Sequence, residues 1–174
     1  QAEFGRNTGG AVIALTRSGS NTFHGGFNVY YEPDALRNDS PDTYAANNSK
    51  DYREKVEGNI WASGPIIKDR LFFFGFFNPR YSNSGDTTRS QGINGDGSPN
   101  GVFADTQRTT QRSNNPFFGG KLDLNLFDGH RVEATYFNDS DKNRVQITSL
   151  SSGAVSEVNE ARGGENYIFK YTGS

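Results

Sequence analysis

The sequence predicts an all-β chain, a fragment of a transmembrane antiparallel β-barrel, from three observations. Six segments alternate apolar side chains with other side chains at the period of two that is typical of strands. Glycine accounts for 21 of the 174 residues and aromatic residues for 13%, which favours strands joined by turns. The connections between the segments alternate strictly between short and long, as they do in outer-membrane barrels.

The six expected strands are residues 22–31, 56–64, 71–81, 118–127, 131–137 and 165–172. Tight turns are expected around 67–70 and 128–130. The three other connections, 32–55, 82–115 and 138–164, are rich in Asn, Asp, Ser, Thr and Gly, and we expect them to be long extracellular loops. Loops of this length are uncommon in a compact soluble domain.

Aromatic residues stand where the expected strands meet the long connections. They are the doublets Tyr30-Tyr31, Phe117-Phe118 and Tyr136-Phe137, and the single Tyr81. We expect them to form the aromatic girdle found at the membrane surface in barrels.

Bulk composition excludes several classes of protein. The formal net charge is −2 and there is no cysteine, so we expect no nucleic-acid partner, no disulfide and no zinc–thiolate site. No apolar run approaches the ~20 residues of a membrane helix. Six strands are fewer than the roughly eight that close a membrane barrel, and the sequence begins at Gln1 without methionine. We therefore expect a processed chain or a fragment.

Two runs of the sequence resemble one family. Residues 2–26, AEFGRNTGGAVIALTRSGSNTFHGG, resemble the junction between plug and barrel in TonB-dependent outer-membrane transporters, and most of all the Oar-like group. Residues 64–74, GPIIKDRLFFF, are similar to the run at the first periplasmic turn of that group. Residues 118–123, FGGKLD, are a looser match. The resemblance covers most of the chain but not the long connections.

The resemblance implies a division of the chain and a function. Residues 1–21 would end the plug domain, and residues 22–174 would form the first six strands of a 22-stranded plugged barrel. It also implies transport of a peptide or protein, an oligosaccharide or an iron chelate, inward or outward, across the outer membrane of a Gram-negative bacterium. The implied partners are outer-membrane lipid, the rest of the same barrel, the TonB complex through a preceding N-terminal segment, and a lipoprotein or other envelope-complex partner.

The resemblance also suggests roles for individual residues. Glu57, Asn59 and Trp61 share the expected lumenal row and are candidates for substrate binding, although plug packing is the favoured alternative. Phe72, Phe74 and Phe76 share the row of Asn78 and would pack against the plug. Arg17 would pin the plug through lumenal acids, for which the candidates are Glu57, Asp123 and Glu133.

Catalysis, metals and cofactors are not expected. The run Asp139–Asn143 is similar to the start of a calcium loop, but Arg144 and Leu150 stand where Gly and Glu are required. The two histidines, His24 and His130, lie in different segments. No nucleophile–base arrangement or phosphate loop is visible, so an enzyme is the least supported class.

Two other classes of protein stay open. A passive porin, or a structural barrel subunit of an envelope assembly, would have an open lumen and no need for a plug strand. A secreted β-sandwich adhesin would be soluble without detergent and would pack its apolar rows on a second sheet.

The first prediction concerns mass. We expect the native polypeptide that carries this sequence, extracted from the envelope with detergent, to have a mass several times 19.1 kDa. Intact mass spectrometry measures it. A 19.1 kDa protein in a detergent-free extract would contradict the barrel.

Overall fold

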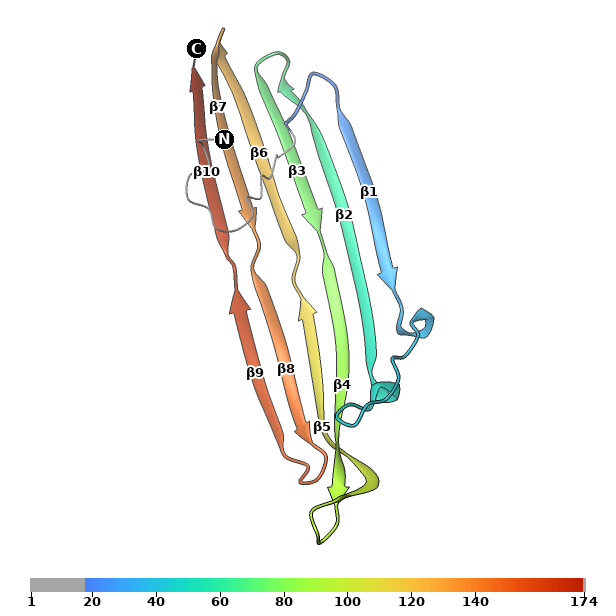
Figure 1. The fold of residues 1–174 in the computed structure, drawn as a ribbon. Helices are drawn as coiled ribbons and strands as arrows, with labels where there is room; N and C mark the ends of the chain where they lie inside the picture. The colour runs from blue at the N-terminus through green and yellow to red at the C-terminus, as the bar shows by residue number, and fades with distance from the viewer. Residues whose placement is uncertain (1–17, 174) are drawn as a thin grey trace, which may run out of the picture.

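The structure is a computed structural model that describes residues 18–173, which form one open antiparallel sheet of ten strands (Figure 1). The prediction of an all-β antiparallel chain is confirmed. The strands are β1 His24–Glu32, β2 Tyr52–Ile67, β3 Leu71–Asn78, β4 Arg80–Ile93, β5 Pro99–Asn114, β6 Phe117–Phe127, β7 His130–Asn138, β8 Asp141–Ser149, β9 Val155–Arg162 and β10 Glu165–Gly173. Two 3-10 turns, η2 Asp34–Leu36 and η3 Asn48–Lys50, lie between β1 and β2. Within residues 18–173, no helix has the length and apolar character needed to cross a membrane.

The sheet has two tiers that follow one another along the strand direction (Figure 1). In the first tier the strand order is β1-β2-β3-β6-β7-β10, and in the second it is β2-β4-β5-β8-β9. Strand β2 belongs to both tiers, because residues 60–67 pair with β3 and residues 52–57 pair with β4. Each tier is a single layer.

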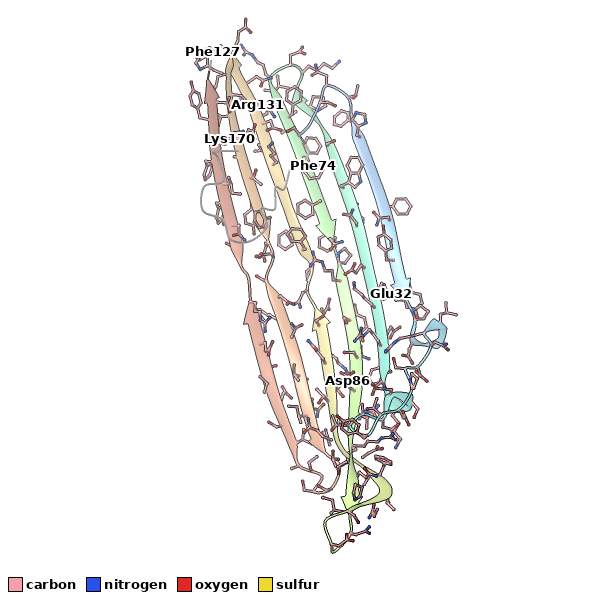
Figure 2. All side chains as sticks on the ribbon, viewed as in Figure 1. Glu32, Phe74, Asp86, Phe127, Arg131 and Lys170 are labelled. Carbon is pink, nitrogen blue, oxygen red and sulfur yellow. The ribbon has the colours of Figure 1, made fainter. Side chains whose placement is uncertain are left out.

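The two faces of the first tier differ in chemistry, and most of the rings drawn in Figure 2 lie along this tier. Residues that are directly opposite in antiparallel strands share a face, so the pairing register assigns each paired side chain to one of the two faces of the sheet. The apolar face carries Phe27, Val29, Tyr31, Ile60, Ala62, Leu71, Phe73, Phe77, Phe118, Leu122, Leu124, Val132, Ala134, Tyr136, Tyr167, Phe169 and Tyr171. The polar face includes Asn28, Glu57, Asn59, Ser63, Lys121, Asp123, Arg131, Glu133, Thr135 and Lys170.

Burial in this sheet is the reverse of that in a soluble domain. Among residues 18–173 no hydrophobic side chain is buried, and the buried polar or charged residues are Ser63, Thr87, Lys121 and Asp123. On the apolar face, Phe27 is 81% exposed. A continuous apolar surface of this kind marks contact with a partner or with lipid. The second sheet that a sandwich adhesin needs is not among the described residues.

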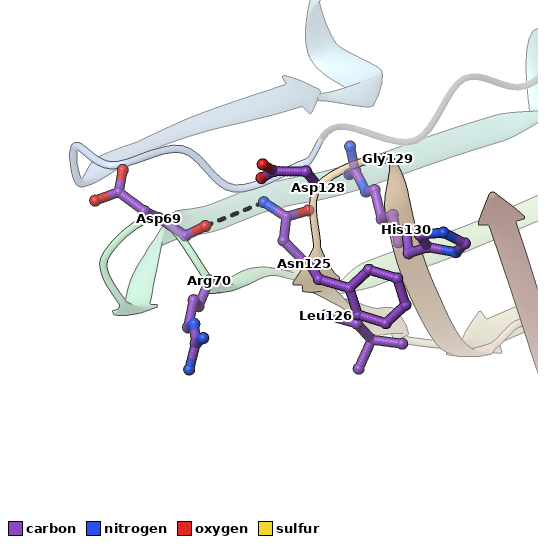
Figure 3. Close-up of a pocket in the computed structure, with 9 residues that line it drawn as sticks. Asp69, Arg70, Asn125, Leu126, Asp128, Gly129 and His130 are labelled. Atoms are coloured by element: carbon purple, nitrogen blue, oxygen red, sulfur yellow. Dashed lines mark hydrogen bonds between the residues drawn. The ribbon is translucent and has the colours of Figure 1, made fainter. Parts of the chain in front are cut away.

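Two short turns close the far end of the first tier, as the sequence predicts. In the turn between β2 and β3, Asp69 takes a positive φ of 63°, which Asp tolerates better than most residues. The Asp69 backbone N–H donates to Asn21 Oδ1 at 2.8 Å, so the chain before β1 holds this turn. Figure 3 shows the pocket of about 650 Å³ between the two turns, where Asn125 Nδ2 donates to Asp69 O at 3.2 Å.

The two tiers meet at a narrow band that we call the waist: Pro79, 115–116, 139–140 and 163–164. Here side chains replace part of the backbone ladder. Asn115 Nδ2 donates to Lys142 O at 3.0 Å, and Asn115 Oδ1 accepts from the Lys142 N–H at 2.8 Å. Asp139 Oδ1 accepts from the Gly164 N–H at 2.9 Å. The sheet therefore continues across the waist although the strands are interrupted.

The second tier differs from the sequence expectation. The connections 82–115 and 138–164, expected as loops, contain the strands β4 and β5 and the strands β8 and β9. These hairpins are mostly polar, and the one alternating run in β8, with Val145 and Ile147 between polar residues, is short. They therefore lack the longer hydrophobic alternation by which half-buried strands are recognised. Their Thr content, as at 87–88 and 109–110, is compatible with strands. The connection 32–55 remains largely irregular.

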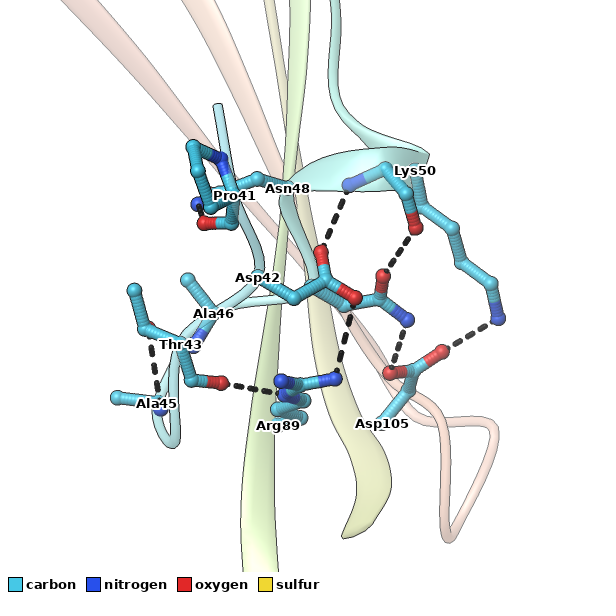
Figure 4. A network of polar contacts seen from close by, with 11 residues as sticks. Pro41, Asp42, Thr43, Ala45, Ala46, Asn48, Lys50, Arg89 and Asp105 are labelled. Carbon is cyan, nitrogen blue, oxygen red and sulfur yellow. Dashed lines mark hydrogen bonds and ion pairs between the residues drawn. The ribbon is translucent and has the colours of Figure 1, made fainter. Parts of the chain in front are cut away.

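A network of polar contacts ties the connection 33–51 to the second tier (Figure 4). Lys50 Nζ lies 2.5 Å from Asp105 Oδ2, and Asn47 Nδ2 donates to Asp105 Oδ1 at 2.8 Å. Arg89 Nη1 lies 3.2 Å from Asp42 Oδ2. The hydrogen bonds from Lys50 and Asn47 hold the pKa of Asp105 below its ordinary value.

The second prediction follows from Asp105. A carboxylate whose pKa is lower in the folded than in the unfolded state stabilises the fold above the unfolded pKa of about 4. That stability is lost as pH falls through the folded pKa. We expect the protection of the backbone amides at Asn47 and Thr87 against hydrogen exchange, relative to the unfolded chain at the same pH, to fall below about pH 4. In Asp105→Asn, this protection should be lower at neutral pH and should change less between pH 7 and pH 3. An unchanged pH profile in Asp105→Asn would contradict this role.

Candidate functional site

The predicted substrate-binding residues share the polar face of β2. Glu57, Asn59 and Trp61 are opposite Tyr30, Asn28 and Gly26 of β1. Asn59 Nδ2 donates to Asn28 Oδ1 at 3.3 Å. The Trp61 indole lies over Gly26, where an added Cβ would come within 2.9 Å of the indole Nε1. Glu57 and Trp61 therefore lie on one surface, with Asn59 between them.

A row of rings crosses this face from β2 to β7. The ring centroids of Trp61 and Phe74 are 6.4 Å apart, those of Phe74 and Phe76 are 6.1 Å apart, and those of Phe76 and Phe117 are 4.8 Å apart. Phe137 then meets Phe117 edge-on at 6.2 Å. Offset and edge-on pairs of this kind stabilise one another beyond simple burial.

The aromatic doublets are split between the two faces, which corrects the girdle expected from them. One ring of each doublet is on the apolar face, namely Tyr31, Phe118 and Tyr136. The other ring, Tyr30, Phe117 or Phe137, is on the polar face. The period of two requires this separation for adjacent residues of one strand. Sequence reasoning therefore missed Phe117 and Phe137 as members of the ring row.

Four charged side chains form a compact network beside the ring row. Lys121 Nζ lies 3.2 Å from Asp123 Oδ1 and 2.9 Å from Glu133 Oε2. Arg131 Nη2 lies 2.9 Å from Asp123 Oδ1, and Arg131 Nε lies 3.3 Å from Glu133 Oε1. The side chains of Lys121 and Asp123 are only 6% and 1% exposed. Buried charges are tolerated because each contacts two of the opposite sign.

The chain before β1 reaches the same network. The Ser18 hydroxyl oxygen accepts hydrogen bonds from Lys121 Nζ at 3.0 Å and from Arg131 Nη2 at 3.1 Å. Gly19 lies against Phe72, since a Cβ added at Gly19 would be 2.6 Å from the Phe72 Cβ. The segment that leads into β1 is therefore placed on the polar face.

The sequence predicted that Arg17 pins the plug through lumenal acids, and the structure describes the acids but not the arginine. Arg17 lies outside the described residues. Asp123 and Glu133 already have the strand partners Lys121 and Arg131. Sequence reasoning named the two acids but not these two bases. The alternation Lys121, Asp123 on one strand and Arg131, Glu133 on the next was the signal that could have shown a cross-strand network.

A second pocket, of about 260 Å³, opens on the polar face at the waist. Lys55 Nζ lies 3.0 Å from Glu57 Oε1 there, and the Arg80 guanidinium stands 4.9 Å from the centre of the Phe117 ring. The pocket is lined by Lys55, Glu57, Arg80, Tyr81, Ser82, Ser113, Asn115, Phe117, Asp139, Ser140, Asp141 and Asn143. Glu57 therefore lines this polar pocket, whereas Trp61 lies farther along β2, in the ring row.

In residues 18–173 no three His, Cys, Asp or Glu side chains are grouped so that they could hold a metal ion. His24 is on β1, where its Nε2 is 2.7 Å from the Thr22 hydroxyl. His130 is on β7 and contacts Tyr171. The arrangement of the polar face is suited to packing and binding.

Comparison with known proteins adds one relative. Over 111 residues the chain is 32% identical to the TonB-dependent transporter Oar of Myxococcus xanthus. The alignment covers 62% of this chain and about a tenth of that protein. This similarity suggests a distant relationship to TonB-dependent receptors. No protein-family model matches the chain, and no solved structure matches it.

The third prediction tests the charge network. Lys121→Met leaves two acids to one arginine on the polar face, so we expect a loss of about 3–5 kcal/mol in the free energy of unfolding. The matched control is Lys55→Met, since Lys55 pairs with Glu57 but is 41% exposed. Exposed pairs contribute about 1 kcal/mol or less. Urea unfolding of the full-length protein in detergent measures both variants, and equal losses would contradict the network.

Proposed function

We propose that this chain is part of the barrel of a TonB-dependent transporter of the Oar-like group, in the outer membrane of a Gram-negative bacterium. The observation that carries the proposal is the sidedness of the first tier, whose apolar face is exposed while its polar face holds buried charges. Lipid would cover the apolar face and stabilise it. The similarity to the Myxococcus transporter supports the same conclusion.

The lengths of the strands support a membrane-spanning first tier. Strands β1, β7 and β10 have 9 residues each and β6 has 11, and a tilted membrane strand needs about 9–11. In this proposal the two short turns face the periplasm. The second tier then stands outside the membrane as polar hairpins. The remaining strands of a 22-stranded barrel would pair with the free edges of β1 and β10.

The polar face would line the lumen, and a plug would lie against it. Residues 18–21 already contact this face through Ser18 and Gly19. Phe72, Phe74 and Phe76 would pack on plug side chains, with Arg17 in the same junction. An N-terminal segment preceding the chain would connect the plug to the TonB complex.

Transport would then follow from movement of the plug. A substrate would first meet the second tier and the connection 33–51, and then the waist pocket with Glu57 and the surface that carries Asn59 and Trp61. Peptides or small proteins, oligosaccharides and iron chelates all fit this mixture of rings, amides and charges. Both import and export are compatible with it. The proposed role involves no catalysis and no cofactor.

The fourth prediction tests the plugged lumen in the full-length protein. We expect Phe74→Ala/Phe76→Ala to weaken docking of the plug by roughly 1–3 kcal/mol, because each aromatic pair contributes about 0.5–1.5 kcal/mol. Cells that express this variant should become sensitive to vancomycin, a hydrophilic probe too large for an intact plugged barrel. The readout is growth inhibition, together with outer-membrane fractionation and heat-modifiable gel mobility to show assembly.

The matched control is Phe73→Ala/Phe77→Ala, on the other face of the same strand. It removes as many rings but should leave the lumen closed. If the wild-type protein already admits vancomycin, the barrel is a passive porin. If both double variants assemble and neither admits vancomycin, the proposed packing of the plug on Phe74 and Phe76 is wrong.

A further inference from the structure

Basic side chains gather on one face of the second tier. The register continues across the waist, because Tyr81 is opposite Val56 of the apolar row and Asn114 is opposite Tyr81. The outward face of the second tier is therefore a continuation of the apolar face of the first. The exposed cations on it are Arg108, Arg112, Lys142 and Arg144.

Arg112 and Arg144 form the centre of this patch. They are directly opposite one another on β5 and β8, and like charges in that position repel. Arg144 Nη2 lies 2.6 Å from Glu157 Oε2, and Arg112 Nε donates to Asn83 Oδ1 at 3.3 Å. Glu157 therefore pairs with Arg144, whereas Arg112 has no carboxylate at ion-pair distance among residues 18–173, and the two arginines together keep a net positive charge.

A pocket lies between the two arginines. It has a volume of about 180 Å³ and is lined by Thr110, Arg112, Arg144 and Gln146. All four side chains can donate hydrogen bonds, and two are forked guanidinium groups. Forked donors match the geometry of phosphate oxygens, and Arg is favoured wherever a phosphate is bound in this way. The chemistry of the pocket suits an oxyanion.

The position of the pocket indicates which oxyanion. Arg112 is two residues beyond Asn114, and hence about 7 Å beyond the level of Tyr81 at the end of the apolar face. We propose, on the basis of the proposed function above, that Arg112 and Arg144 bind the phosphate group of an outer-leaflet lipid headgroup. The lipid chains would lie on the apolar face and the headgroup would reach the pocket. Juxtamembrane arginines are attracted to anionic lipids in this manner.

The binding experiment uses the full-length protein in a nonionic detergent at low salt. It is titrated with phosphatidic acid, which presents a phosphomonoester, with phosphatidylcholine and with inorganic phosphate, and thermophoresis gives each Kd. We expect phosphatidic acid to bind more tightly than phosphatidylcholine. Arg112→Gln/Arg144→Gln should weaken binding of phosphatidic acid by about 30-fold, since each arginine near an anionic surface contributes about 1 kcal/mol.

Arg162→Gln is the matched control. Arg162 is an exposed arginine of the same tier that also pairs with a glutamate, Glu160 at 3.0 Å, but it is on the inward face opposite Asp141. Its loss should leave the Kd within about twofold. Equal affinity of the double variant and the wild type, or equal weakening in the control, would overturn the proposal. Inorganic phosphate binding as tightly as phosphatidic acid would overturn the lipid as the source.

Membrane fractionation of the cells that produce the full-length protein separates the headgroup proposal from the transporter proposal on which it rests. A wild-type protein absent from the outer membrane contradicts the transporter, whatever the pocket binds. A protein that resides in the outer membrane but lacks selectivity for phosphatidic acid contradicts the headgroup site alone.

Discussion

The structure depends on one constraint: a single sheet whose two faces meet different surroundings. In a soluble domain the apolar face of such a sheet would be buried on another layer. Here the rows of β1, β3, β6 and β10 remain exposed, and Phe169 keeps 77% of its surface. Lipid can stabilise this face without a second layer. In the proposed transporter this sheet would form a wall between hydrocarbon and a polar interior.

The polar face follows from the same constraint. Side chains there must satisfy one another or meet protein, because they lie beside rings instead of open water. Lys121, Asp123, Arg131 and Glu133 form ion pairs of opposite charge, which balance the charge although the Asp123 oxygens and Arg131 Nε make no hydrogen bond within the described residues. Ser18 joins them from the segment before β1. A face with buried charge and a row of rings presents both polar and apolar contact to whatever fills the lumen.

Much of the first tier could be predicted from sequence because its strands are half apolar. The alternation in 71–81 placed Phe72, Phe74 and Phe76 on one face, as the register shows. The strands of the second tier were not predicted, because its hairpins are mostly polar and their alternating run at Val145 and Ile147 is too short to stand out. The charge network was predicted only in part. Asp123 and Glu133 were named as lumenal acids, but their partners depend on a pairing register that sequence alone does not give.

The waist explains how one sheet can serve both regions. In the first tier, the outward row is made of rings and aliphatic chains. In the second tier, the same row becomes Asn83, Arg112 and Arg144. Interrupting the strands at Pro79 and at 139–140 lets the backbone adjust there, and Asn115 and Asp139 supply the hydrogen bonds that the ladder loses. The break in regular pairing thus falls where the outward face changes from apolar to charged, so the hairpins beyond it can adopt their own curvature without disturbing the wall.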